Sequence, residues 1–160
     1  MEHGFFERQL AAYSAYHREP RNRLTHFVGI PMIVFSLLAL AAPWNLSVGG
    51  IEISAAWIAA LAAAAGWIAL DPLIGAAMLA ALVPMVLIAG WAAGRYGTAG
   101  SEWLFAAFFV GGWIFQFVGH AFERRRPALM DNLFQAFVGP MFVMAELLAA
   151  LRIRRRPDLA

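Results

Sequence analysis

Residues 73–94 read LIGAAMLAALVPMVLIAGWAAG, an apolar stretch without a charged side chain. As an α-helix, at ~1.5 Å per residue, it would extend about 33 Å, which is enough to cross the ~30 Å hydrocarbon core of a bilayer. Four further apolar stretches approach that length, at residues 27–43, 53–70, 101–119 and 133–151. These stretches predict an integral membrane protein.

The composition agrees with a lipid environment. Hydrophobic residues make up 62% of the 160 residues, charged residues make up 14%, and the mean hydropathy is +0.66. A soluble domain is about half apolar, and a chain this short could not bury so much apolar surface. Only helices satisfy their own backbone in lipid over these lengths, so the predicted class is all-α. We expect one membrane domain over residues 1–160, with an N-terminal segment (1–26), membrane helices (27–151) and a basic tail (152–160).

The arginines predict the topology. They form three clusters, at residues 8–23, 124–126 and 152–156, and Arg95 lies outside them. Because cytoplasmic loops carry an excess of basic residues, all three clusters are placed on the cytoplasmic side. Four crossings between the first two clusters satisfy this rule, and a fifth crossing would carry the tail outside. We therefore expect both termini in the cytoplasm. We also expect the protein to lie in a bacterial-type inner (cytoplasmic) membrane.

The fifth apolar stretch is expected not to cross. It contains Gly139 and Pro140 near its middle, and proline breaks or kinks a helix. We expect a Pro-broken re-entrant or interfacial helical segment, and the alternative is a bundle of five spans. Residues 48–53 are expected to form a short outer loop. The short connection Asp71–Pro72 predicts an antiparallel hairpin of the second and third spans.

Composition also excludes some classes of site. The chain has no cysteine, so a transition metal would be held by histidine, carboxylate or water. The sequence pI of about 9.7 comes from arginines beside apolar segments. Membrane topology explains these clusters, and no nucleic-acid partner is expected. The sequence does not predict an oligomeric state.

Three of the four histidines are predicted to meet at the cytoplasmic boundary. His17 and His26 are nine residues apart and would lie on opposite faces of one straight helix. Pro20 predicts a break between them, after which Asn22 is expected to cap the first span. His26 then starts the first span and His120 ends the fourth, so the two lie at similar depth, and the turn brings His17 back toward them.

Three imidazoles near carboxylates suit Fe(II), Zn(II) or Mn(II), and histidine with open positions suits non-haem iron and O₂. The alternative for any one of these histidines is an ordinary interfacial residue that binds a headgroup or a neighbour. Glu123 follows His120 by three residues and is a candidate catalytic residue. It could be a fourth ligand or a carboxylate that orients an imidazole. The alternative is that it pairs with the adjacent arginines. Glu146 lies inside an apolar run, where a carboxylate is costly and often functional, unless it snorkels to water.

Other polar residues complete the candidate site. We expect side chains that orient the ligands or contact the substrate at Asn22, Gln116, Asp131, Glu146, Arg18 and Arg23.

Two motif blocks are similar to a known family. They comprise Tyr16-His17, Asn22, Thr25-His26 and Gly29-Ile30-Pro31, and then Gln116-Phe117-Val118-Gly119-His120, Phe122-Glu123, Arg126-Pro127-Ala128-Leu129, Asp131-Asn132-Leu133, Gln135, Gly139-Pro140, Phe142 and Glu146. In these blocks the chain resembles a family of small membrane proteins typified by a fungal 2-hydroxy-fatty-acid dioxygenase. The match runs from Tyr13 to Glu146, but residues 45–101 match in hydropathy alone.

The resemblance implies an Fe(II)-dependent reaction with O₂ that shortens a 2-hydroxy fatty acid by one carbon, a step of α-oxidation. It points to His17, His26 and His120 as metal ligands, with water, substrate or a carboxylate completing the coordination. The bilayer would then hold the fatty-acid chain. Two alternatives stay open: a zinc-dependent membrane lipid hydrolase, and a non-enzymatic scaffold or small transporter. The near absence of polar residues from 53 to 94 argues against a transporter.

Overall fold

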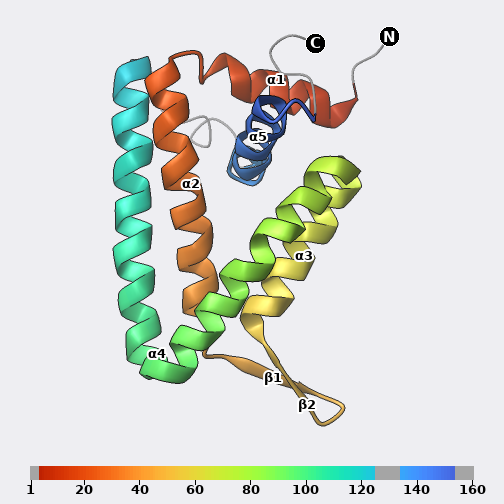
Figure 1. The fold of residues 1–160 in the computed structure, drawn as a ribbon, viewed down its shortest axis with the longest axis vertical. Helices are drawn as coiled ribbons and strands as arrows, with labels where there is room; N and C mark the ends of the chain where they lie inside the picture. The colour runs from red at the N-terminus through yellow and green to blue at the C-terminus, as the bar shows by residue number, and fades with distance from the viewer. Residues whose placement is uncertain (1–3, 125–133, 154–160) are drawn as a thin grey trace. The chain divides into compact units, whose positions relative to one another are not determined.

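The computed structural model describes residues 4–124 and 134–153, without the side chain of Val48. These residues form five helices and one two-stranded sheet (Figure 1). The elements, in order, are α1 (Phe5–Ala15), α2 (Pro20–Ala41), β1 (Asn45–Val48), β2 (Ile51–Ser54), α3 (Ala55–Leu70), α4 (Pro72–Glu123) and α5 (Phe134–Ala150). The chain divides into two compact units, residues 1–30 with 113–160 and residues 31–112. The prediction of one membrane domain stays a prediction.

In the first unit, α1 packs on α5. Phe6, Leu10 and Tyr13 are buried, and their spacing places them on one face of α1. The ring centroids of Phe5 and Phe134 lie 5.6 Å apart at one end of this contact. Those of Tyr13 and Phe142 lie 4.9 Å apart at the other end. Aromatic pairs therefore fix most of the length of α1 against the first half of α5.

The α5 helix corrects one prediction. It runs continuously from Phe134 to Ala150 with Pro140 inside, so the expected Pro-broken pair of short helices is wrong. Proline removes one backbone hydrogen bond, but neighbouring elements can compensate for this loss. A Cβ at Gly139 would lie 3.1 Å from the Tyr13 hydroxyl oxygen, so glycine lets α1 approach α5 beside the proline. That α5 does not cross the membrane stays a prediction, with five spans as its alternative.

The start of α2 corrects a second prediction. The helix begins at Pro20, whose fixed φ suits the first helical position, whereas the predicted span began at residue 27. Asn22 therefore lies inside the first turn, and its predicted role as the helix cap is wrong.

In the second unit, α3 and α4 form the predicted hairpin around Asp71. The Ser54 hydroxyl accepts a hydrogen bond from Ala56 N (3.2 Å) and begins α3. The Asp71 carboxylate accepts one from Ile74 N (2.9 Å) and caps the start of α4. A Cβ at Gly75 would overlap the backbone of Ile68, so the two helices can approach here only because residue 75 is glycine.

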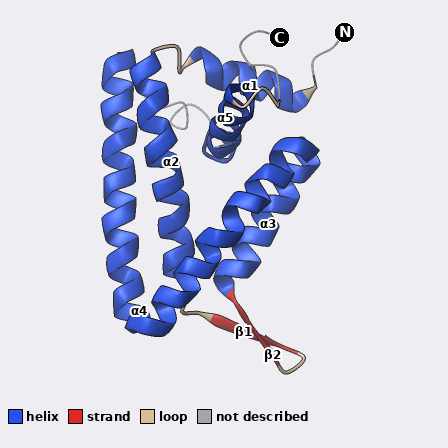
Figure 2. Ribbon diagram, viewed as in Figure 1, coloured by secondary structure: helices blue, strands red, loops and turns tan. Residues whose placement is uncertain are grey.

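The predicted outer loop at residues 48–53 is largely β-structure. Strands β1 and β2 pair antiparallel, with Asn45 opposite Ser54 and Val48 opposite Ile51 (Figure 2). Gly49 and Gly50 connect them with positive φ values of 61° and 84°, as a two-residue type I′ turn requires. The all-α prediction thus holds for the rest of the described chain and fails at this hairpin.

The third and fourth predicted spans are the two arms of α4. Gly97 separates them with φ 65° and ψ −168°, and the chain turns sharply there (Figure 1). Only glycine adopts this region of backbone conformation readily. The arms, residues 72–96 and 98–123, are each longer than the ~20 residues that a membrane crossing needs.

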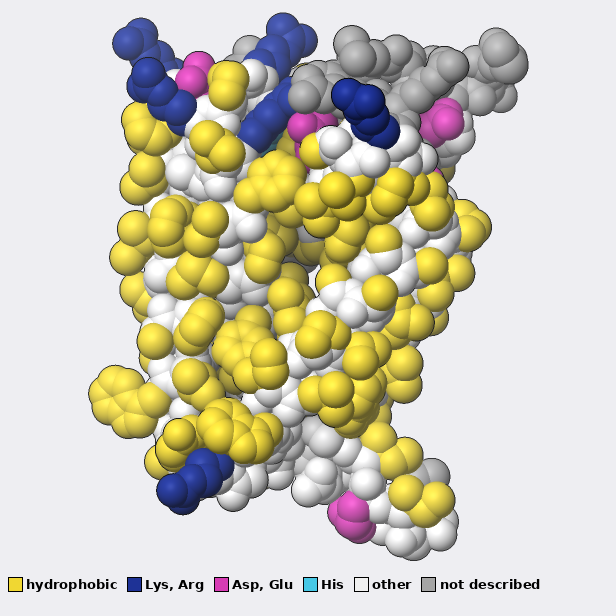
Figure 3. Space-filling view, in the orientation of Figure 1, with side chains coloured by type: hydrophobic (Ala, Val, Ile, Leu, Met, Phe, Trp, Pro, Cys, Tyr) yellow, Lys and Arg dark blue, Asp and Glu magenta, His cyan; other side chains and the backbone are white. Residues whose placement is uncertain are grey.

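Length and composition support membrane association for two helices of the described chain. These are α2 and α4, which contain 18-residue stretches with mean hydropathies of 2.1 and 2.4, whereas α3 and α5 are apolar but shorter. Hydrophobic side chains cover much of the visible surface (Figure 3). Large apolar side chains on α4 are exposed at Leu87, Ile88, Val110 and Ile114. The number of four transmembrane spans stays a prediction.

Gly97→Ala is expected to lower the free energy of unfolding by about 1–3 kcal/mol, because alanine is strained at this backbone conformation. Gly90→Ala is the matched control, since a Cβ there meets nothing within 4 Å in a regular part of α4. It should be neutral or gain up to about 1 kcal/mol. Thermal unfolding in detergent, followed by circular dichroism, measures both. Equal stability of the two variants would contradict the role assigned to Gly97.

Candidate metal centre

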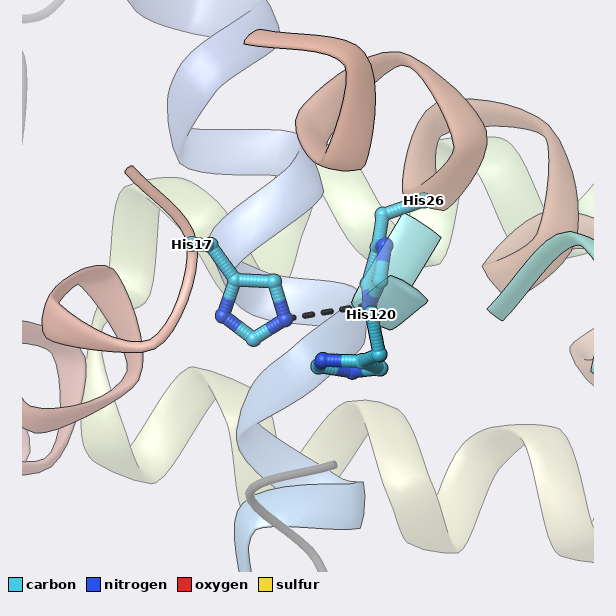
Figure 4. Close-up of side chains that lie close together, drawn as sticks. All are labelled: His17, His26 and His120. Carbon is cyan, nitrogen blue, oxygen red and sulfur yellow. Dashed lines mark hydrogen bonds between the residues drawn. The ribbon is translucent and has the colours of Figure 1, made fainter. Parts of the chain in front are cut away.

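Three imidazoles meet inside the first unit. His17 lies in the turn after α1, His26 in the second turn of α2, and His120 near the end of α4 (Figure 4). One ring nitrogen from each lies within 4.8 Å of the others. The three residues are 0%, 1% and 5% exposed. The sequence prediction that these histidines come together is confirmed, but their role as ligands is not thereby tested.

The break before Pro20 places His17 beside His26. The α1 helix ends at Ala15, and His17 N–H donates to the Ser14 carbonyl (3.0 Å) in the turn that follows. Pro20 then begins α2 in a new direction. Through this turn, two histidines nine residues apart reach a ring-centroid distance of 4.4 Å.

Backbone carbonyls fix the tautomers of these two rings. His17 Nδ1–H donates to the Tyr13 carbonyl (2.7 Å), and His26 Nδ1–H donates to the Asn22 carbonyl (2.9 Å). A carbonyl oxygen only accepts, so in each neutral ring the proton is on Nδ1 and Nε2 is bare. The two Nε2 atoms nevertheless lie 3.0 Å apart. Two facing lone pairs at this distance require a cation between them, either a proton or a metal ion.

Burial keeps His17 uncharged at neutral pH. Its pKa is lowered to about 4, chiefly because burial penalises the charged ring, and the nearby His120 and Arg23 act in the same direction. The hydrogen bond to the Tyr13 carbonyl opposes this shift. Burial likewise raises the pKa of Tyr13, so its ring stacks on His17 as a neutral phenol, with centroids 4.1 Å apart. A neutral imidazole is the form that binds a metal.

His120 adds the third ring. Its centroid lies 5.0 Å from that of His26 and 5.1 Å from that of His17. Its Nδ1 is buried and has no hydrogen-bond partner among the described residues. A buried polar atom without a partner costs about 1–3 kcal/mol, and a ligand would remove this cost.

Glu123 binds the turn that carries His17. Its carboxylate accepts hydrogen bonds from Arg18 N (3.1 Å), Glu19 N (2.8 Å) and Asn22 Nδ2 (3.2 Å). Among the described residues, the group of side chains that could hold a metal ion comprises the three histidines and no carboxylate. The prediction of Glu123 as a fourth ligand therefore stays a prediction, whereas its contact with the turn is observed.

Arg23 and Glu146 lie on the other side of the same turn. Arg23 Nε donates to the His17 carbonyl (2.7 Å), and its Nη1 donates to Glu146 Oε2 (3.2 Å). Both side chains are largely buried. The Arg23 guanidinium also lies 5.9 Å from the centroid of the Phe142 ring. These contacts engage Arg23 inside the protein; the sequence predicted that Arg23 orients a ligand or contacts the substrate.

The remaining candidates take different positions. Asn22 is fully buried, and its Oδ1 has no hydrogen-bond partner among the described residues. Gln116 lies one helical turn before His120 and is also buried. Its Nε2 has no hydrogen-bond partner among the described residues. Arg18 is at an exposed position, and its backbone N–H contacts Glu123. Asp131 lies outside the described residues.

Sequence reasoning missed the aromatic rings around His17. Tyr13 stacks on it, and Phe142 lies with its ring centroid 5.7 Å away. The four-residue spacing from Tyr13 to His17 was a usable signal, because residues four apart share a helix face. Phe142 had no comparable signal, since its contact with His17 joins residues distant in the sequence.

The sequence matches known proteins over most of its length. The family model "2-hydroxy-palmitic acid dioxygenase Mpo1-like" matches residues 4–151. The chain is 35% identical over 145 residues to the 2-hydroxy-palmitic acid dioxygenase MPO1 of Saccharomyces cerevisiae, covering 89% of this chain and 79% of the yeast protein. No solved structure matches the chain. The matched region contains all three clustered histidines and nearly the whole sequence, and the chain belongs to the Mpo1-like family.

Proposed function

We propose that this protein is an Fe(II)-dependent dioxygenase that shortens 2-hydroxy fatty acids by one carbon, with His17, His26 and His120 as its metal ligands. Membership of the Mpo1-like family and the activity in the name of the yeast relative support the reaction class. The observation that carries the metal site is the pair of bare Nε2 atoms 3.0 Å apart, with a third buried imidazole beside them.

The chemistry of the three side chains fits a first-row metal. Metal-bound histidines commonly donate their other N–H to a backbone carbonyl, as His17 and His26 do here. Three imidazoles leave coordination positions for water, for substrate or for the carboxylate of Glu123, and such open sites suit Fe(II). When bound, Fe(II) would supply a Lewis acid able to react with O₂, and O₂ is the proposed co-substrate.

The chain's own residues hold the ligands and limit the access of water. The carbonyls of Tyr13 and Asn22 keep the protons on Nδ1 and aim both Nε2 atoms at one point. The rings of Tyr13 and Phe142 pack around His17 and exclude water from it. Glu123 fixes the backbone of the turn. We assign roles in orienting the ligands or contacting the substrate to Asn22 and Gln116.

The proposed reaction suits a membrane protein. A 2-hydroxy fatty acid has a polar head with two kinds of oxygen and an apolar chain. The apolar helices α2 and α4 favour a lipid environment for that chain. We propose that the histidines lie at the cytoplasmic boundary of a bacterial-type inner membrane, with both termini in the cytoplasm.

The proposed centre depends on a close approach of α2 to the end of α4. A Cβ at Gly119 would overlap the side-chain oxygens of Thr25 and Asn22 and would lie 3.3 Å from His26 Nδ1. Neither side chain can move away freely, because each is held by a hydrogen bond. Thr25 donates to the Asn22 carbonyl (2.7 Å), and the Asn22 amide binds Glu123. Glycine at this position therefore permits His120, the next residue, to meet His26.

Gly119→Ala is expected to weaken metal binding at least tenfold, because the added methyl group separates α2 from α4. Overpacking of this kind costs about 1–3 kcal/mol. Gly90→Ala serves again as the control, since it adds the same methyl group to α4 in open space. Anaerobic titration with Fe(II) measures both variants. Wild-type affinity in Gly119→Ala would show that the site does not require this contact.

The metal and the oxidant can be tested together. Protein purified anaerobically without chelators should contain iron and should consume O₂ in the presence of a 2-hydroxy fatty acid, releasing an acid one carbon shorter. His26→Ala and His120→Ala should each lose the metal and the activity, whereas Glu102→Gln, an exposed change on α4, should lose neither. Unchanged metal content in both histidine variants rejects the shared site. Turnover that persists without O₂ rejects the dioxygenase and favours a zinc-dependent hydrolase.

A further inference from the structure

We infer that Arg23 and Glu146 are positioning residues for His17, an inference that rests on the proposed metal site. Neither side chain belongs to the histidine cluster. Arg23 binds the backbone carbonyl of His17 through Nε (2.7 Å) and binds Glu146 through Nη1 (3.2 Å). The pair thus links the residue that carries one ligand to both α2 and α5.

His17 needs such support more than the other two histidines do. His26 and His120 lie within helices, whose backbone hydrogen bonds fix their positions. His17 lies in the turn between α1 and α2, outside any helix. From one side, Glu123 accepts the N–H groups of Arg18 and Glu19. From the other side, Arg23 donates to the carbonyl of His17, so the turn is held between two carboxylates, one directly and one through an arginine.

Burial distinguishes this ion pair from a surface pair. The side chains of Arg23 and Glu146 are 17% and 9% exposed, with a separation of 3.2 Å. Arg21 and Glu19, nearby in the sequence, are 72% and 38% exposed at 3.8 Å. Exposed pairs contribute little, whereas a buried charge requires its partner. Glu146 Oε1 is buried and has no partner among the described residues, so the hydrogen bond to Arg23 is made by Oε2 alone.

The geometry favours positioning over direct contact with the substrate. Arg23 directs Nε and Nη1 at two acceptors within the protein. If Arg23 bound the substrate carboxylate instead, its loss would raise KM and leave metal affinity unchanged. If it positions His17, its loss weakens the binding of metal in the absence of substrate. Metal affinity of the substrate-free protein therefore separates the two roles.

The test is a titration of the full-length, metal-free protein in detergent with Co²⁺, followed by visible absorption. Arg23→Met, Glu146→Leu and the double variant should each weaken Co²⁺ binding about 10–100-fold, the usual effect of removing a group that orients a ligand. The double variant should lose no more than the weaker-binding single variant, because both residues act through one contact. Arg21→Met, two residues away and exposed, should stay within about twofold of wild type.

Two further features keep the inference falsifiable. The double variant leaves no unpaired buried charge and should keep the wild-type circular dichroism spectrum. Arg23→Lys keeps the charge for Glu146, but one ammonium replaces the two N–H groups that reach two acceptors, so it should also bind Co²⁺ more weakly. Wild-type affinity in the double variant or in Arg23→Lys overturns the positioning role. Failure of the wild-type protein to bind Co²⁺ instead overturns the metal site and the proposed function with it.

Discussion

Two imidazole nitrogens face each other at 3.0 Å, and each ring already donates its proton to a backbone carbonyl on its far side. This contact between His17 and His26 is unfavourable in the neutral protein without a cation between the nitrogens. Burial makes the requirement stronger, because it keeps His17 neutral and prevents water from separating the rings. The surrounding contacts hold the rings in this arrangement, so the local structure favours a cation, a proton or a metal ion, between the two nitrogens.

The turn between α1 and α2 connects this constraint to the fold. The α1 helix ends at Ala15 and α2 begins at Pro20. The turn between them places His17 next to the first residues of α2. Hydrogen bonds hold both faces of the turn, to Glu123 on one side and to Arg23 on the other. The α5 helix takes part through Phe142 and Glu146, although neither residue is near the turn in the sequence. A continuous α5 is needed for this, because these two side chains lie one helical turn apart and contact the same region.

Features that depend on local sequence patterns could be predicted, whereas contacts between residues distant in the sequence could not. Hydropathy predicted the apolar helices, and the short connection Asp71–Pro72 predicted the hairpin of α3 and α4. The histidine cluster was predictable because His26 and His120 were each expected at one end of a span, and the break at Pro20 was expected to turn His17 back toward them. The β-hairpin was missed because its segment was interpreted only as a link between membrane spans. Gly49–Gly50 between stretches of alternating apolar and polar residues is nevertheless a strong local signal for it. The approach of Tyr13 to Gly139 on α5 and the pairing of Arg23 with Glu146 both join residues distant in the sequence. Neither has a local pattern.

The two units differ in the polar groups that they bury. The interior of the first unit includes three histidines, Asn22, Gln116, Gln135 and Glu146, whereas the buried polar residues of the second unit are two serines. Burying charged and hydrogen-bonding groups is expensive, and several of these atoms lack partners among the described residues. The interior of the second unit is instead alanine-rich and apolar apart from Ser36 and Ser101. Local violations of good packing are expected where a protein binds something. The unsatisfied atoms His120 Nδ1, Asn22 Oδ1 and Gln116 Nε2 lie at or within one helical turn of the clustered histidines, and a bound metal with a polar substrate head would supply partners of the kind that they lack.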